Sequence, residues 1–290
     1  MAYDKIIIDK IFDYLQNKKF ERISSVMDLG DQDLNITYEE IINKFKKHNI
    51  ENNEEKFKRL KNFPSRPRVP SSTLWLSLGF KKADRIDLKR LIRDSSNFGD
   101  GNVYEVDLNN SFKNESLKNN YDLVTDFGNN EHVFNVAEAF KTTHELCKEN
   151  GLIWIMQNLF GGNGLYNFDL SYFELIAAAN EYQIEDSFMI INKNGKYDIT
   201  QINSKVFETN FDQVQEVKVS YLFRKSYLNK FKFPYQGIGD SPHHDKFYEL
   251  NNNSKIYDLK RFYIPRNISQ IKTYILIKEI INRIKKKFLR

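Results

Sequence analysis

Cysteine is nearly absent from this 290-residue chain, where Cys147 is the single one. One thiol excludes an intramolecular disulfide framework and fits a reducing compartment. Long apolar runs are also missing, and no segment approaches the roughly 20 apolar residues that cross a bilayer. The first twenty residues lack the apolar centre of a signal peptide, because charges recur between Asp4 and Lys10. We therefore expect a cytoplasmic protein.

An excess of one charge and the usual phosphate loops are missing too. The net charge of +5 is mild, and no aromatic-plus-basic recognition module occurs, so we expect no nucleic-acid partner. Neither G-x-G-x-x-G nor G-x-x-x-x-G-K-[ST] is present, which removes the common glycine-based cradles for phosphate. What is there, 40% hydrophobic and 14% aromatic residues, is typical of a folded chain with a full core.

Short apolar segments that end in an acid alternate with segments of helical spacing. The predicted strands are 23–28, 83–86, 103–106, 121–125 and 151–156, and the acids are Asp28, Asp87, Asp107 and Asp126. The carboxyl ends of parallel strands share one edge of an open sheet, where ligands bind. The pattern therefore predicts an α/β fold, a doubly wound, mostly parallel Rossmann-like sheet with polar groups along one edge.

The remaining segments predict helices and a C-terminal antiparallel hairpin. Helical spacing or capping signals mark 4–15, 37–48, 53–62, 71–78, 134–148 and 172–179, and alternation marks strands 182–191, 197–202 and 214–223. Thr37 and Glu40 form a capping box, and Asn194-Gly195 marks a turn. On the helix 134–148, His144 shares a face with apolar residues, which favours a core histidine over a ligand.

We interpret 1–237 as one domain and 238–290 as a C-terminal extension. Within the domain, 37–73 is a helical insertion after the first strand, either a lid over the ligand end or a surface excursion. The segment 268–290 combines an apolar face with a basic one. It could contact an anionic membrane peripherally or a partner, but a helix docked on its own domain is the simpler interpretation. His243-His244-Asp245 resembles a metal motif, yet adjacent histidines seldom ligate one ion well, and we expect no metal.

The acids suggest a nucleoside without phosphate. An acid after the second strand, here Asp87, can accept both ribose hydroxyls. Several acids without a phosphate cradle suit a cationic adenosine, and S-adenosylmethionine (SAM) carries a sulfonium and an ammonium. Acids at strand ends also occur in hydrolases and isomerases, so the pattern leaves those classes open.

Four segments together resemble the class I SAM-dependent methyltransferases: Val26–Gly30, Arg85–Asp87, Val106–Asn109 and Tyr121–Asn135, the last with its Gly-x-x-Glu-His-Val-Phe-Asn run. The loop Gly164–Phe168 and the later Pro234–Gln236 are similar to a bacterial branch often found with surface-polysaccharide gene clusters. The resemblance covers about 24–237. Two positions depart from it, because Gln32 stands where a second glycine is usual and Asn163 stands where a histidine is usual.

The resemblance implies a set of cofactor contacts. These are Asp28 and Gly30 at the methionine end, Asp87 at the ribose, Asp107 and Leu108 at the adenine, and Asp126, Phe127 and Gly128 beside the methyl group. Glu131 and His132 would face the acceptor. A histidine is the usual base at neutral pH, so His132 is the candidate base with Glu131 as its partner. The other interpretation is that His132 caps the next helix or holds its loop. Asn163 and Tyr166 would hydrogen-bond a hydroxylated acceptor.

The sequence thus predicts a SAM-dependent methyltransferase that acts on an oxygen of a sugar, or of a sugar-linked group such as a phosphoramidate, in capsule or O-antigen assembly. The expected partner is a small-molecule or saccharide acceptor. One alternative is a non-catalytic scaffold of the same fold. The first loop suggests it, because Gln32 replaces its usual second glycine. Another is a nicotinamide-dependent oxidoreductase, which the missing phosphate loop argues against.

Overall fold

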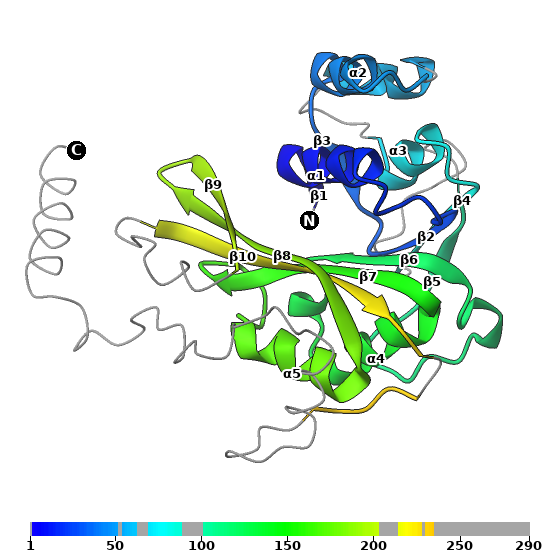
Figure 1. The fold of residues 1–290 in the computed structure, drawn as a ribbon, viewed down its shortest axis with the longest axis vertical. Coiled ribbons are helices and arrows are strands. Elements are labelled where there is room, and N and C mark those ends of the chain that lie inside the picture. Colours follow the sequence, from blue (N-terminus) through cyan, green and yellow to red (C-terminus); the bar gives the residue numbers. More distant parts are fainter. Residues whose placement is uncertain are drawn as a thin grey trace, which may run out of the picture.

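A computed structural model describes residues 2–51, 54–62, 69–88, 101–202, 214–227 and 230–234 (Figure 1). The helices and 3₁₀ turns are α1 (Lys5–Gln16), α2 (Tyr38–Lys47), η1 (Glu54–Asn62), α3 (Ser71–Ser77), η3 (Glu115–Leu117), η4 (Asn130–His132), α4 (Val136–Leu146) and α5 (Leu170–Asn180). The strands are β1 (Ala2–Asp4), β2 (Ser25–Leu29), β3 (Asp33–Asn35), β4 (Lys82–Asp87), β5 (Val103–Glu105), β6 (Tyr121–Phe127), β7 (Cys147–Phe160), β8 (Tyr182–Lys193), β9 (Lys196–Gln201) and β10 (Val214–Lys225).

The described strands form one large mixed sheet with the order β5-β4-β2-β6-β7-β10-β8-β9. Strands β5, β4, β2, β6 and β7 are parallel to one another, and β10, β8 and β9 run antiparallel. The β8–β9 hairpin turns at Asn194 and Gly195, which both have positive φ, as a type I′ turn requires. The doubly wound, mostly parallel sheet and its C-terminal antiparallel hairpin are therefore confirmed.

Helices cover both faces of this sheet (Figure 1). Alternate strand residues point to opposite faces, so β2 sends Val26 into the core under α1 and α3 while Met27 enters the core under α4 and α5. The helix α1 presents Ile7, Ile11 and other apolar residues at helical spacing to the first core. This three-layer arrangement leaves the strand ends as the places where polar side chains can gather.

The insertion after β2 contains α2, η1 and α3, together with a short strand that sequence patterns did not predict. β3 pairs in parallel with β1 in a separate two-stranded sheet. The predicted capping box is present, with Thr37 and Glu40 each accepting from the other's backbone. The ring of Phe45 on α2 lies 5.3 Å from that of Phe12 and 5.5 Å from that of Phe57, so aromatic contacts hold the insertion to α1. The segment near 53–62 is a 3₁₀ helix rather than an α-helix.

The boundary between α4 and β7 differs from the predicted one. The helix ends at Leu146, and β7 begins directly at Cys147 rather than at 151. Lys225 of β10 explains the early end, because its Nζ donates to the carbonyl oxygens of His144 and Cys147 at 2.8 Å each and so satisfies the last turn. His144 is buried, with Nδ1 2.6 Å from the hydroxyl of Tyr182, which confirms it as a core histidine.

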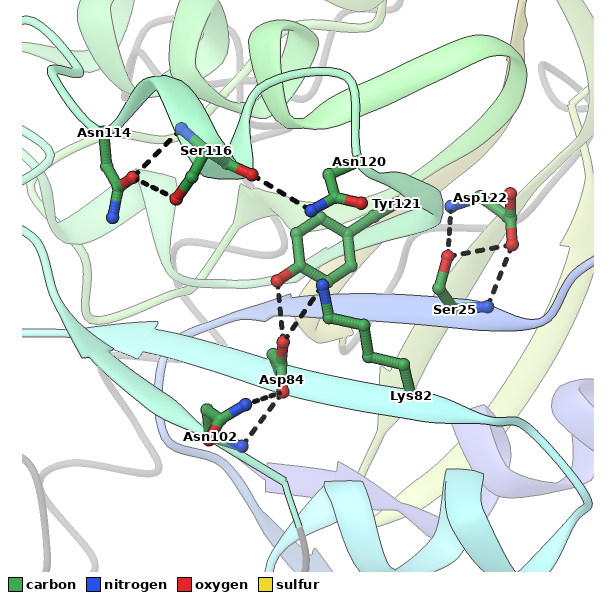
Figure 2. Close-up of polar contacts among 9 residues, drawn as sticks. All are labelled: Ser25, Lys82, Asp84, Asn102, Asn114, Ser116, Asn120, Tyr121 and Asp122. Atoms are coloured by element: carbon green, nitrogen blue, oxygen red, sulfur yellow. Dashed lines mark hydrogen bonds and ion pairs between the residues drawn. The ribbon is translucent and has the colours of Figure 1, made fainter.

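Some acids of the sheet tie strands together away from the carboxyl edge (Figure 2). Asp122, near the amino end of β6, accepts from the backbone and hydroxyl of Ser25 at 3.0 and 2.8 Å. Burial opposes its charge, but Lys148 and these donors lower the pKa of Asp122 to about 2. Asp84 accepts from the hydroxyl of Tyr121 at 2.7 Å. A carboxylate on a strand is therefore not by itself a sign of a site in this sheet.

A buried carboxyl on α5 faces the core instead. Glu174 is 8% exposed, and the hydroxyl of Tyr221 on β10 is a distant donor at 3.4 Å. Burial, with a smaller contribution from the charge of Asp169, raises the pKa of Glu174 to about 8. The folded protein thus holds a proton at neutral pH that the unfolded chain releases.

We expect this proton to make stability depend on pH. Above the ordinary pKa of glutamate and below the raised one, the free energy of unfolding should fall by about 1.4 kcal/mol per pH unit as pH rises. Glu174→Gln should remove this part of the slope. Urea unfolding of both proteins between pH of about 5 and 8 measures it. Asp126, whose pKa burial raises to about 7, acts equally in both and cancels in the difference. If the free energy of unfolding depended on pH in the same way in both proteins, the raised pKa of Glu174 would be contradicted.

Candidate active site

The carboxyl ends of the parallel strands meet along one edge of the sheet. Strands β4 and β5 lie to one side of β2, and β7 lies beyond β6, so the winding direction reverses between β2 and β6. Ligands of open α/β sheets bind in the crevice outside such a switch point. Gly30 and Gly128 follow β2 and β6 directly at this crevice, and Asp87 ends β4 beside them.

Asp28 lies beneath this edge rather than on it. Its side chain is 1% exposed and accepts hydrogen bonds from the hydroxyls of Tyr3 (2.6 Å), Ser71 and Thr125. Burial raises the pKa of Asp28, although these three donors and the charge of Arg85 oppose the shift. Asp28 therefore joins β1, α3 and β6 to the end of β2, and it shapes the crevice from below.

Asp87 connects the end of β4 to the first loop. Its two carboxylate oxygens accept from the backbone N–H groups of Asp31 (2.8 Å) and Leu88 (2.7 Å). The turn at Gly30 has a φ of +88°, and its N–H donates to the carbonyl oxygen of Ile86 at 2.8 Å. Each oxygen of a carboxylate has a second acceptor position, and Asp87 is only partly buried. It can therefore still accept hydroxyl donors from a ligand.

Beside Asp87, the chain after β5 forms an open hollow. It has a volume of about 700 Å³ and is lined by residues 105–107 and 110–114, which is within the usual range for small-molecule sites. Asp107 is exposed and accepts from the backbone and side-chain N–H of Asn109, both at 2.9 Å, while Leu108 is buried. The hollow adjoins the position where the resemblance places adenine.

The residues after β6 form a tight turn around a buried carboxyl. Asp126 is fully buried and accepts from the backbone N–H of Asn129 (3.0 Å) and from Nε2 of Gln157 (2.6 Å). Burial raises the pKa of Asp126 to about 7. The ring of Phe127 packs 4.9 Å from that of Trp154 in the core, so only its backbone reaches this edge. Gly128 has a φ of +72° and continues the turn.

Glu131 and His132 differ in exposure although they are neighbours. Glu131 is fully buried, and its carboxylate accepts from the backbone N–H of Asn158 at 2.8 Å. The side chain of His132 is 43% exposed, with Nε2 3.6 Å from Oε1 of Glu131. Burial raises the pKa of Glu131 and lowers that of His132, which favours a neutral imidazole. The N-cap of α4 is Asn135, so His132 does not cap that helix.

The glycine-rich loop after β7 is attached to this pair. The carbonyl oxygen of Glu131 accepts from the N–H groups of Leu165 (2.7 Å) and Tyr166 (3.2 Å). A Cβ at Gly164 would lie 2.8 Å from that oxygen, so glycine is required for this approach. The hydroxyl of Tyr166 donates to the carbonyl oxygen of Phe134 at 2.7 Å. Asn163 is exposed on the same loop, directly before Gly164. The loop that carries the two residues predicted to bind the acceptor, Asn163 and Tyr166, is therefore attached to the turn that carries His132.

Sequence reasoning missed the polar residues that hold these loops. Gln157 and Asn158 follow the predicted strand 151–156, and this strand-end position was a signal that could have marked them. Tyr3 and Ser71 lie far from Asp28 in sequence and gave no such signal.

Several segments discussed from the sequence lie outside the described residues. These are Tyr235 and Gln236, His243-His244-Asp245 and the tail 268–290. Within the described part, no three His, Cys, Asp or Glu side chains are placed to hold a metal ion, and no helix is long and apolar enough to cross a membrane.

Comparisons with known proteins return structural neighbours alone. No protein-family model and no curated protein matches the chain. A SAM-dependent methyltransferase from Archaeoglobus fulgidus is similar at 12% identity and a TM-score of 0.40, over 75% of this chain and 94% of that one. The 1,6-didemethyltoxoflavin-N1-methyltransferase of Burkholderia thailandensis, with S-adenosylhomocysteine bound, is similar at 11% identity and a TM-score of 0.42, over 75% and 78%. TehB from Haemophilus influenzae reaches 13% identity and 0.41, over 73% and 61%.

Proposed function

We propose that this chain is a SAM-dependent methyltransferase. The observation that carries the proposal is the gathering of acids and tight glycine turns around the switch point between β2 and β6. Positive-φ turns at Gly30 and Gly128 let backbone approach a ligand closely. Acids beside them favour a cation and disfavour phosphate. A phosphate-free nucleoside with a sulfonium and an ammonium fits this set of groups.

The cofactor would extend along the edge from the switch point to the hollow after β5. Asp87 would hold the ribose hydroxyls, and Asp107 and Leu108 would flank the adenine in the adjoining hollow. Gly30 would border the methionine end and Gly128 the methyl group. Asp28 and Asp126, together with the backbone of Phe127, would keep these turns in place from below.

His132 would act as the base on the acceptor side. When bound, SAM supplies a methyl carbon that an acceptor oxygen attacks as the bond from carbon to sulfur breaks. The neutral imidazole of His132 would take the proton of the acceptor hydroxyl, and the buried carboxylate of Glu131, 3.6 Å away, would orient the ring. Asn163 and Tyr166 would position the acceptor, which supports a hydroxylated substrate.

We propose a sugar oxygen, or a sugar-linked group such as a phosphoramidate, as the acceptor, in the biosynthesis of capsule or other surface polysaccharide. Support comes from the resemblance of 164–168 and 234–236 to a polysaccharide-associated branch. In this proposal 1–237 is the catalytic domain, with 37–73 as its insertion and 238–290 as an extension whose tail could contact a membrane. A non-catalytic scaffold is the second candidate, because Gln32 fills part of the crevice at the switch point.

Titration calorimetry with SAM and S-adenosylhomocysteine tests the proposal. The wild-type chain should bind both, and Asp87→Ala should weaken binding by about 10-fold or more, because hydroxyl hydrogen bonds to a charged group contribute about 1.5–3 kcal/mol. Asp198→Ala, an exposed acid on β9, is the matched control and should bind normally. No heat at millimolar ligand would favour the scaffold, and unchanged affinity in Asp87→Ala would remove Asp87 from the ribose role. Fluorescence enhancement of NADH on mixing would instead revive the nicotinamide alternative.

A further inference from the structure

Gln32 bridges the two strand ends at the switch point. Its Nε2 donates to the carbonyl oxygen of Leu29 at 3.2 Å and to that of Phe127 at 3.1 Å. These carbonyls belong to the last residues of β2 and β6. The Gln32 side chain is 5% exposed. The carboxamide therefore lies inside the molecule, where the two central strands end side by side.

The turn that precedes Gln32 places this side chain. The N–H of Gln32 donates to the carbonyl oxygen of Gly30 at 3.0 Å. A Cβ at Gly30 would lie 3.2 Å from Oδ1 of Asn129 and 3.5 Å from Cγ of Gln32. The first loop and the loop after β6 are thus in contact here. A ligand group that enters between the two strand ends must displace the Gln32 carboxamide.

One atom of this carboxamide is left unsatisfied. The buried Oε1 of Gln32 has no hydrogen-bond partner in the described structure. Buried polar atoms are nearly always paired in native proteins. The observed position of the Gln32 side chain is therefore energetically unfavourable for its oxygen. The nitrogen, by contrast, has two main-chain acceptors, the carbonyl oxygens of Leu29 and Phe127.

We propose that Gln32 is a built-in gate for the cationic end of the cofactor. This inference rests on the proposed function. An ammonium group is an N–H donor that the carbonyls of Leu29 and Phe127 would accept, and the Gln32 amide holds the same two acceptors. The cofactor binds at this end after Gln32 has turned away. Its apparent affinity is therefore reduced by the fraction of molecules in the open state.

The gate predicts a gain of affinity when Gln32 is shortened. In titration calorimetry with S-adenosylhomocysteine, Gln32→Ala should lower Kd by about fivefold or more, as expected if the closed state dominates. Gln32→Met, which fills similar space without an N–H donor, should also bind more tightly, and it guards against a local collapse in the alanine variant. Gln183→Ala, an exposed glutamine on β8, should not change Kd. 5′-Methylthioadenosine, which lacks the amino-acid end, should bind all four proteins within about twofold.

The outcomes separate the gate from the proposed function. Tighter binding of S-adenosylhomocysteine by both Gln32 variants, without a matching gain for 5′-methylthioadenosine, supports the gate. Equal or weaker binding by the variants, while the wild type binds, overturns the gate and leaves the methyltransferase proposal standing; weaker binding would mean that Gln32 itself accepts the ammonium. An equal gain for both ligands also overturns it. No binding of either ligand by any of the proteins overturns the proposed function and the gate together.

Discussion

Replacing His132 with glutamine should lower kcat for methyl transfer by about 10²–10⁴-fold, the usual contribution of a positioned base, and leave Kd for S-adenosylhomocysteine within about twofold. Glutamine keeps the approximate length and polarity of the side chain but cannot take a proton at neutral pH. The reason for a large effect is geometric, because His132 is exposed at the rim while its neighbour Glu131 is buried under it. Apart from Gly128, the proposed cofactor contacts Gly30, Asp87, Asp107 and Leu108 lie at or after the ends of β2, β4 and β5 and not on the loop of His132.

The measurement is transfer of a labelled methyl group from SAM into a surface-polysaccharide extract from a strain that lacks the gene. His48→Gln is the matched control, since His48 is the C-cap residue of α2 and its ring packs 4.8 Å from that of Phe12 on α1, so the substitution should not affect the rate. The wild-type rate should rise with pH through a pKa below the ordinary value, because burial lowers the pKa of His132 and the base acts in its neutral form. The His132→Gln variant should not show this rise of rate with pH. A variant as fast as the wild type would show that His132 has a structural role.

Asp28→Ala should cost about 3–5 kcal/mol of unfolding free energy, because a buried polar group that loses its partner costs about 1–3 kcal/mol and Asp28 has three such donors. The substitution leaves the hydroxyls of Tyr3, Ser71 and Thr125 without their shared acceptor and opens a cavity beneath the switch point. Each buried hydroxyl left unpaired carries a desolvation penalty of its own. Because the three donors come from β1, α3 and β6, the loss should loosen the whole support of the crevice.

Urea unfolding at neutral pH measures this loss. Asp28→Asn is the matched control, because it keeps the shape and one oxygen acceptor, and it should lose less than half as much. A loss below about 0.5 kcal/mol in Asp28→Ala, the scale of an ordinary surface substitution, would contradict the role of Asp28 as the shared acceptor of the three hydroxyls. In that case a direct contact with the cofactor would be the better explanation of its position.

The elements of the fold follow from local signals in the chain. Apolar segments that end in an acid predicted the parallel strands, and alternation predicted the antiparallel ones. The capping box at Thr37 predicted the start of α2 correctly, because its hydrogen bonds join residues three apart. The errors lie where distant residues intervene. α4 ends early because Lys225 satisfies its last carbonyls, and β3 exists because β1 pairs with it.

In the candidate site, too, local sequence signals determined some features and contacts between distant residues determined the others. The residues by themselves determined that acids, glycines and a histidine end the strands of a parallel sheet, and parallel winding brings such ends to one edge. Tertiary structure decided which of them face solvent there. Asp28, Asp126 and Glu131 are buried because serine, tyrosine, glutamine and asparagine side chains from other elements converge on them, whereas Asp87 and His132 keep open sides. A carboxylate looks the same in sequence in either position, since the partners that bury it are contributed by distant parts of the chain.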